Sequence, residues 1–262
     1  MAQLMAGKRG LILGVANDHS LAWGIAKVLS EHGAEMAFTY QGEGFGRRVR
    51  PLAESLGASI ILPADVQDPA SLDALFAHLK EAWGGLDFLV HAIAYSEKAE
   101  LDGRFIETSR ENFQRSLDIS CFSLVELIRR SEPMMHSGSS IVTLSYLGAQ
   151  RVTPNYNVMG VAKAALECSV RYLANDLGPS GIRVNALSPG PMRTLAGAAI
   201  SGARKVYKFT EQNAPMRANA SLDAVGNAAL YLLSDLASST TGEVLFVDGG
   251  FHALGMAQAE NM

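Results

Sequence analysis

The sequence predicts an α/β protein with a doubly wound, seven-stranded parallel sheet and helices on both of its faces. Three observations predict this class. Short apolar runs alternate with longer amphipathic stretches, and each run is apolar throughout, as in strands that are buried on both faces. Strand–helix alternation of this kind is typical of a parallel sheet between two layers of helices. The chain has 262 residues, of which 48% are hydrophobic, so it can bury a core of that size.

The expected strands are separated by enough residues for a helix between each pair. Asp68 followed by Pro69 is typical of a helix start, and Ser221 is a second one. Seven strands use up the chain, so we expect one Rossmann-type domain over residues 1–262. The strands are expected at 10–14, 35–39, 59–62, 88–90, 140–144, 183–187 and 244–247, and helices at 20–32, 69–83, 155–177 and 221–234.

One long stretch does not fit the alternation of strands and helices. Residues 189–220 are rich in glycine, alanine, serine and proline. Irregular segments of this length often cover a site and open and close over it. We therefore expect a mobile, substrate-binding segment here.

Composition excludes several classes of function. The net charge is −4 and the charged residues are scattered, whereas nucleic-acid-binding proteins concentrate basic residues on one surface. Cys121 and Cys168 are too few for a disulfide framework and lack metal-ligand spacing, so we expect reduced, packed thiols and no metal. No apolar run approaches the roughly 20 residues that span a bilayer, and the N-terminus lacks a signal-peptide pattern. A cytoplasmic protein with no nucleic-acid or membrane partner is expected.

The junction after the first strand is suited to a bound pyrophosphate. Gly14 lets the backbone approach a phosphate, and a helix that begins near Ser20 would point free N–H groups at it. Gly24 would let this helix pack closely on the strand. The alternative is an ordinary strand–helix turn capped by Ser20, because the G-x-G-x-x-G pattern is incomplete.

Two further positions indicate the kind of nucleotide. Asp65 and Val66 follow the third strand, where an adenine ring would accept and donate hydrogen bonds; the alternative for Asp65 is a helix cap. The second strand ends at Gln41, which could hold the adenosine ribose more weakly than an aspartate. The arginines at 47–48 could reach a 2′-phosphate, but Glu43 would repel it. NADH is therefore favoured over NADPH.

Tyr156 and Lys163 are the strongest candidates for a reactive pair. They are seven residues apart in an expected helix, so their side chains share one face, about 10 Å apart in rise. This separation suits a lysine that holds the nicotinamide ribose and a tyrosine that addresses the substrate. A nearby ammonium is expected to favour the ionised form of the tyrosine. The alternative is a surface tyrosine and lysine on an amphipathic helix.

The chain resembles a short-chain dehydrogenase/reductase, and within that superfamily the enoyl-acyl-carrier-protein reductases of bacterial fatty-acid synthesis, the FabI type. The resemblance covers essentially the whole chain. Its most specific feature is the six residues between Tyr156 and Lys163, where most short-chain dehydrogenases have three. A second tyrosine ten residues earlier, Tyr146, also belongs to the enoyl reductases. The segments that carry it are GVAN at 14–17, SLAWG at 20–24, SYLGA at 145–149, YNVMGVAK at 156–163, NALSPGP at 185–191, TGEV at 241–244 and VDGG at 247–250.

This resemblance implies a reaction and a role for each site residue. A trans-2-enoyl thioester on an acyl-carrier protein would accept hydride from NADH at its β-carbon and, after protonation at its α-carbon, become the saturated thioester. Tyr156 would donate a hydrogen bond to the enolate oxygen, Lys163 would hold the nicotinamide ribose, and Tyr146 would shape the pocket or assist proton supply. Ser96 falls at a substrate-side position. The implied cofactor positions are Gly14, Ser20, Leu21, Gln41, Asp65, Val66, Ile93, Lys163, Met192, Arg193, Thr194, Leu195 and Ala196.

The sequence departs from the family's pattern in residues 91–98. Ala92 stands in place of part of a commonly seen Ser-Ile-Gly or Ser-Ile-Ala core. Residues 96–98, Ser-Glu-Lys, are more polar than expected beside a fatty acyl chain. These departures bear on substrate preference more than on the type of reaction.

The resemblance also implies partners. Acyl-carrier protein is acidic, so its docking site should be basic and close to residues 189–220; the alternative is an ordinary solvated helix face. The family is usually a homotetramer, in which helices such as 111–135 and 155–177 pair across subunits. The candidate docking residues are Arg193, Arg204, Lys205 and Lys208.

Two other functions fit the same fold. One is carbonyl chemistry, as in a ketoacyl reductase or an alcohol dehydrogenase, against which the Tyr156–Lys163 spacing argues. The other is a nucleotide-binding protein without enzymatic activity, which a fold alone never excludes. The presence of Tyr146 together with the other two residues argues against it.

Overall fold

The computed structural model describes residues 3–198 and 200–261 and contains the predicted sheet. All seven strands are parallel and lie in the order β3-β2-β1-β4-β5-β6-β7, which confirms the α/β class. The order reverses between β1 and β4, and a doubly wound sheet binds ligands beyond the carboxyl ends of its strands at such a point. The strands are β1 (Arg9–Leu13), β2 (Glu35–Tyr40), β3 (Ile61–Pro63), β4 (Phe88–His91), β5 (Ser140–Leu144), β6 (Arg183–Pro189) and β7 (Val244–Val247).

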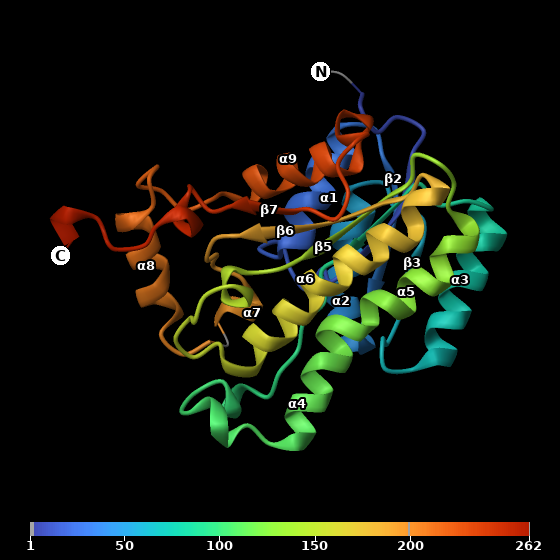
Figure 1. Cartoon of the computed structure of the whole chain (residues 1–262). Coiled ribbons are helices and arrows are strands. Elements are labelled where there is room, and N and C mark those ends of the chain that lie inside the picture. The colour runs from blue at the N-terminus through green and yellow to red at the C-terminus, as the bar shows by residue number, and fades with distance from the viewer. Residues whose placement is uncertain (1–2, 199, 262) are drawn as a thin grey trace.

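Helices cover both faces of the sheet, as Figure 1 shows. Successive side chains of a strand point to opposite faces, so Ile12 joins one apolar cluster while Leu11 and Leu13 join the other. All three side chains are fully buried. The first cluster contains α1 (Leu21–Glu31), α2 (Gly42–Ser55) and α9 (Leu222–Leu233), and the second contains α3 (Pro69–Trp83), α5 (Ser123–Ser131) and α6 (Asn157–Leu177).

The two helix starts marked by capping residues are confirmed. The Asp68 carboxylate accepts a hydrogen bond from the Ala70 N–H at 3.0 Å, and the Ser221 hydroxyl accepts one from the Ala224 N–H at 3.1 Å. These bonds satisfy N–H groups that have no partner within the helix. The predicted helix at 69–83 has the observed limits.

The sequence did not predict α2. This helix contains Pro51 and three glycines, which weaken the helical signal. It forms because Val49 and Ala53 pack into the core beside β2. Tertiary packing therefore outweighs local propensity here. The helix α4 (Arg110–Leu117) continues through a π-helical turn, Asp118–Phe122, into α5.

The 189–220 segment is partly helical rather than irregular throughout. It contains α7 (Leu195–Ala198) and α8 (Ala203–Asn213), and Figure 1 shows α8 beside the C-terminal part of the chain. Asn213 joins the two, because its side-chain oxygen accepts from the Gln258 N–H at 2.8 Å. That this segment moves stays a prediction. Among the described residues, no helix has both the length and the apolar character required to cross a membrane.

Candidate active site

The candidate site lies where the carboxyl ends of β1, β4, β5 and β6 meet at one edge of the sheet. Gly14 follows β1 with a φ of +100°, and a Cβ at this position would lie 2.0 Å from the Ala92 carbonyl oxygen, just after β4. Only glycine fits both the conformation and the space. The ends of β1 and β4 therefore approach each other closely at the topological switch point, where a dinucleotide binds in this class of fold.

Ser20 lies at the start of α1 but does not cap the helix with its side chain. Its hydroxyl accepts from the N–H groups of Ala16 at 2.9 Å and Asn17 at 3.0 Å, so it fixes the preceding loop instead. The side-chain cap that the alternative expected from Ser20 is therefore absent, although Ser20 is still the residue that immediately precedes α1. Because this side chain leaves the N–H groups at the start of α1 uncapped, they remain suited to a phosphate.

The structure brings Gln41 and Asp65 together at the ends of β2 and β3. The Gln41 amide donates to Asp65 Oδ2 at 3.0 Å. Asp68 rather than Asp65 caps α3, so the alternative role of Asp65 is wrong. Glu43 is paired with Arg50 at 2.8 Å, and this hydrogen bond lowers the pKa of its carboxyl. Sequence reasoning missed Arg50, whose spacing of seven residues from Glu43 along a helix was the available signal.

Tyr156 and Lys163 are both buried, which excludes the alternative of a surface pair: they are 7% and 5% exposed. Lys163 lies within α6, whereas Tyr156 immediately precedes the helix, which begins two residues later than expected. The Tyr146 ring packs edge-on against the Tyr156 ring with a centroid separation of 5.0 Å. Lys163 Nζ donates to the carbonyl oxygen of Leu144 at 2.6 Å, which ties α6 to the end of β5.

Burial dominates the electrostatics of these three side chains. It raises the pKa of Tyr156, with a further contribution from Tyr146, and it raises the pKa of Tyr146 to about 12. Burial also lowers the pKa of Lys163 to about 8. The expectation that the ammonium favours an ionised tyrosine is therefore wrong, because desolvation penalises the phenolate. Tyr156 is a neutral phenol that can donate a hydrogen bond.

The polar residues after β4 bind to protein partners. The Ser96 hydroxyl donates to Asn112 Oδ1 at 3.2 Å, and the same oxygen accepts from the Glu97 N–H at 3.0 Å. Glu97 also accepts from Arg115 at 3.1 Å. Asn112 is 2% exposed, and no sequence pattern indicated a role for it. The unexpected polarity of residues 96–98 thus belongs largely to a hydrogen-bond network with α4.

The remaining predicted residues surround this edge of the sheet. Ile93 and Val66 pack against the second apolar cluster, and Leu21 and Met192 against the first. Thr194 Oγ1 accepts from the Gly197 N–H at 3.0 Å at the start of α7. Leu195 is 46% exposed, and Ala196 lies in α7 with its side chain outside the described part of the chain.

The basic residues expected to bind a partner lie together near α8. The Arg193 guanidinium lies 4.7 Å from the centre of the Tyr207 ring, which places it against this helix. Arg204, Lys205 and Lys208 are exposed on α8 itself. No group of His, Cys, Asp or Glu side chains suited to a metal ion occurs within residues 3–198 and 200–261.

Comparison with known proteins identifies the family. Residues 14–252 match the family described as enoyl-(acyl carrier protein) reductase. The chain is 55% identical to "Enoyl-[acyl-carrier-protein] reductase [NADH] 2" of Rhizobium meliloti (strain 1021), over 99% of this chain and 97% of that protein. The crystal structure of FabI from Candidatus Liberibacter asiaticus superposes with a TM-score of 0.96 at 50% identity, covering 98% and 100% of the two chains.

A second solved structure contains a nucleotide. It is the reductase from Anaplasma phagocytophilum in complex with NAD, with a TM-score of 0.94, 53% identity, and coverage of 99% of this chain and 97% of that one. The family match and the full-length identity together place the chain in one group. The chain belongs to the enoyl-acyl-carrier-protein reductases of the short-chain dehydrogenase/reductase superfamily.

Proposed function

We propose that this chain uses NADH to reduce trans-2-enoyl thioesters, carried by acyl-carrier protein, to saturated acyl thioesters in fatty-acid elongation. The observation that carries the proposal is the Tyr146 ring packed against the buried Tyr156, with Lys163 buried in the helix that follows, in a chain whose full-length relatives are named as NADH-dependent enoyl reductases. A tyrosine and a lysine on the solvent-facing surface of a helix would be exposed and would not be packed in this way.

The residues present fit a nicotinamide dinucleotide. Gly14 leaves space where a Cβ would fill the crevice between β1 and β4, and Ser20 leaves the start of α1 free for the pyrophosphate. Gln41 and Asp65 offer polar groups for the adenosine end. When bound, NADH would supply the hydride that the β-carbon of the thioester accepts, and a proton taken up at the α-carbon would complete the reduction.

The side chains of the site bind the substrate and cofactor and stabilise the negative charge that develops during the reaction. Tyr156, as a neutral phenol, donates a hydrogen bond to the thioester oxygen, where negative charge develops as the enolate forms. Lys163, whose ammonium donates to the Leu144 carbonyl oxygen, would hold the ribose hydroxyls by hydrogen bonds. Tyr146 packs against Tyr156 and limits rotation of its ring. The buried surroundings strengthen each of these interactions.

Replacement of one hydroxyl tests the proposal. Tyr156→Phe should lower kcat with a trans-2-enoyl thioester by about 10²- to 10³-fold and leave the Kd for NADH unchanged, because it removes a single oxyanion donor. Tyr231→Phe is the matched control, since Tyr231 lies on α9 and is 38% exposed. NADH oxidation by wild type should occur with the enoyl thioester and not with a 3-ketoacyl thioester. Turnover of the ketoacyl substrate alone would refute the proposed reaction.

We also propose that the basic residues on α8 dock the acidic carrier protein. Arg204→Glu with Lys205→Glu should raise KM for the carrier-bound substrate about tenfold and leave KM for a small thioester unchanged. Lys80→Glu, on the exposed face of α3, is the control for charge reversal elsewhere. An equal increase for both substrates would contradict carrier docking at this helix.

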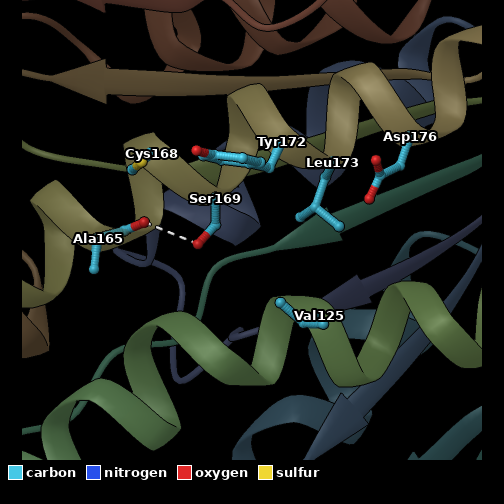
Figure 2. Close-up of a pocket in the computed structure, with 7 residues that line it drawn as sticks. All are labelled: Val125, Ala165, Cys168, Ser169, Tyr172, Leu173 and Asp176. Carbon is cyan, nitrogen blue, oxygen red and sulfur yellow. Dashed lines mark hydrogen bonds between the residues drawn. The ribbon is translucent and has the colours of Figure 1, made fainter.

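A homotetramer is the proposed assembly. Apolar side chains are exposed on α6, on α4 and on the turn that joins α4 to α5; Tyr172 and Phe122 are 71% and 47% exposed. A groove of about 420 Å³ lies between α5 and α6. Figure 2 shows Tyr172 on one side of it and Val125 on the other. A second subunit would cover this surface. Light scattering should give four subunits for wild type and fewer for Phe122→Asp; a wild-type monomer would contradict the proposal.

The organisation of the chain and its location are also proposals. We propose one domain over residues 1–262 in which the 189–220 segment closes over the substrate. Hydrogen exchange in this segment should slow when NADH and a substrate analogue bind. A cytoplasmic location is supported by the two free cysteines, which suit a reducing compartment.

A further inference from the structure

A buried carboxylate lies next to the catalytic side chains and has no part in the reaction as proposed above. Glu167 is on α6, one turn beyond Lys163, and is 5% exposed. A buried carboxylate destabilises a fold unless its oxygens accept hydrogen bonds. Within residues 3–198 and 200–261, no basic side chain is within ion-pair distance of it. Its hydrogen-bond partners therefore indicate its role.

Both oxygens of Glu167 bind to the segment that follows β5. The Ser145 hydroxyl donates to Oε1 at 2.6 Å, and the Gln150 amide donates to Oε2 at 3.0 Å. These two residues are the first and last of the 145–150 segment, which we call the tyrosine loop because it carries Tyr146. A single carboxylate on α6 thus holds both ends of the tyrosine loop.

The tyrosine loop is packed against the catalytic phenol. A Cβ on Gly148 would lie 2.4 Å from the Tyr156 ring, and a Cβ on Gly160 of α6 would lie 2.8 Å from the Gly148 carbonyl oxygen. The Tyr146 ring contacts the Tyr156 ring from the same loop. Because there is no room for a methyl group at either glycine, a displacement of the loop would move the Tyr156 ring together with Tyr146.

Glu167 also acts on the charge of Lys163. Three titratable groups influence this lysine from the surrounding elements: Cys121 of the π-helical turn, His91 of β4 and Glu167 of α6. Burial raises the pKa of Cys121 and lowers that of His91 to about 3, so both are neutral at pH 7. The carboxylate favours the ammonium form of Lys163 and opposes the effect of burial.

We propose that Glu167 is a positioning residue for the reduction, which holds both ends of the tyrosine loop against α6 and places a carboxylate one turn from Lys163. This inference rests on the proposed function, because it assigns Glu167 to the same site. The negative charge and the two acceptor oxygens have separate consequences. A glutamine at 167 would lose the charge and present an NH₂ group to one of the two donors, whereas an aspartate would keep the charge and lose reach.

The two variants separate these consequences. Glu167→Gln should lower kcat about 10- to 100-fold, because small displacements of catalytic groups are costly, and leave the Kd for NADH within about threefold. It should also shift the alkaline limb of the kcat–pH profile, which reports Lys163, to lower pH. Glu167→Asp should lower kcat while this limb stays in place. Glu54→Gln, the same exchange on the exposed face of α2, should match wild type.

The outcomes are distinguishable from failure of the proposed function. If wild type does not reduce the enoyl thioester, the proposed function fails. If wild type does reduce it, the role of Glu167 is overturned when Glu167→Gln has a kcat within twofold of wild type or leaves the alkaline limb of the kcat–pH profile in place. Should Glu167→Gln not fold, Gln150→Ala decides, because Gln150 is exposed and supplies only one of the two bonds. A fall in kcat of about threefold or more at unchanged NADH affinity supports the proposal, and a smaller one overturns it.

Discussion

The burial of Lys163 should make the stability of the cofactor-free protein depend on pH in the alkaline range. Burial lowers the pKa of this lysine from its ordinary value of 10.5 to about 8. Between these values the unfolded chain binds a proton that the native chain does not, so the free energy of unfolding rises with pH in this window. The buried ammonium therefore destabilises the native state by about 3 kcal/mol at pH 7, about 2 kcal/mol at pH 9 and less than about 1 kcal/mol at pH 10.

Lys163→Met removes this effect together with the hydrogen bond to the Leu144 carbonyl oxygen. Loss of that bond costs about 1 kcal/mol at any pH. The variant should thus lose activity, and it should be about 2 kcal/mol more stable than wild type at pH 7 and no more stable at pH 10. Urea unfolding at fixed protein concentration measures the difference, with Lys80→Met on exposed α3 as the control. A difference between Lys163→Met and wild type that stays constant from pH 7 to 10 would refute the reasoning.

Three further predictions follow from close contacts and buried groups. Gly14→Ala should weaken NADH binding at least about tenfold in a fluorescence titration, because alanine is strained at this φ and its Cβ meets a carbonyl oxygen. Gly44→Ala is the control and should bind NADH as wild type does, because there is open space around Gly44. Equal NADH affinities of Gly14→Ala and wild type would contradict this prediction. Gly148→Ala should displace the Tyr156 ring and lower kcat about 10- to 100-fold at unchanged NADH affinity; an unchanged kcat would show that the ring is not held there. Burial lowers the pKa of His91 from 6.5 to about 3, so the free energy of unfolding falls as pH falls through this range, by about 3 kcal/mol at pH 4.5. In urea unfolding, His91→Gln should remove this part of the pH dependence of stability. An unaltered dependence of the unfolding free energy on pH would contradict the prediction.

The strands could be predicted from the sequence because a strand buried on both faces is a short run of residues that is apolar throughout. Residues 140–144 and 244–247 were expected as strands and are β5 and β7 without change of limits. Helix α2 leaves a weaker record, since its glycines and Pro51 oppose helix formation and its stability comes from contacts with distant parts of the chain. Local pattern therefore predicts this sheet better than the helices around it.

For the candidate site, sequence reasoning found residue types but not their environments. Tyr156 and Lys163 were found from their spacing, yet the ionisation of Tyr156 was predicted wrongly, because spacing along a helix says nothing about exclusion of water. Glu167 was missed, although it lies one turn from Lys163, because its partners are 17 and 22 residues away in sequence. The role of a buried acid depends on which donors the fold brings to it.

The strand order has a consequence for how this protein folds. The neighbours β1 and β4 are separated along the chain by two strands and three helices, and the crevice where Gly14 meets Ala92 needs both strands in place. Contacts between such distant segments form slowly, and in the partly folded chain the unpaired parallel strands expose apolar surface and free strand edges. Nucleotide binding should thus appear only at the end of refolding, and NADH in the medium should capture completed molecules and reduce aggregation by mass action.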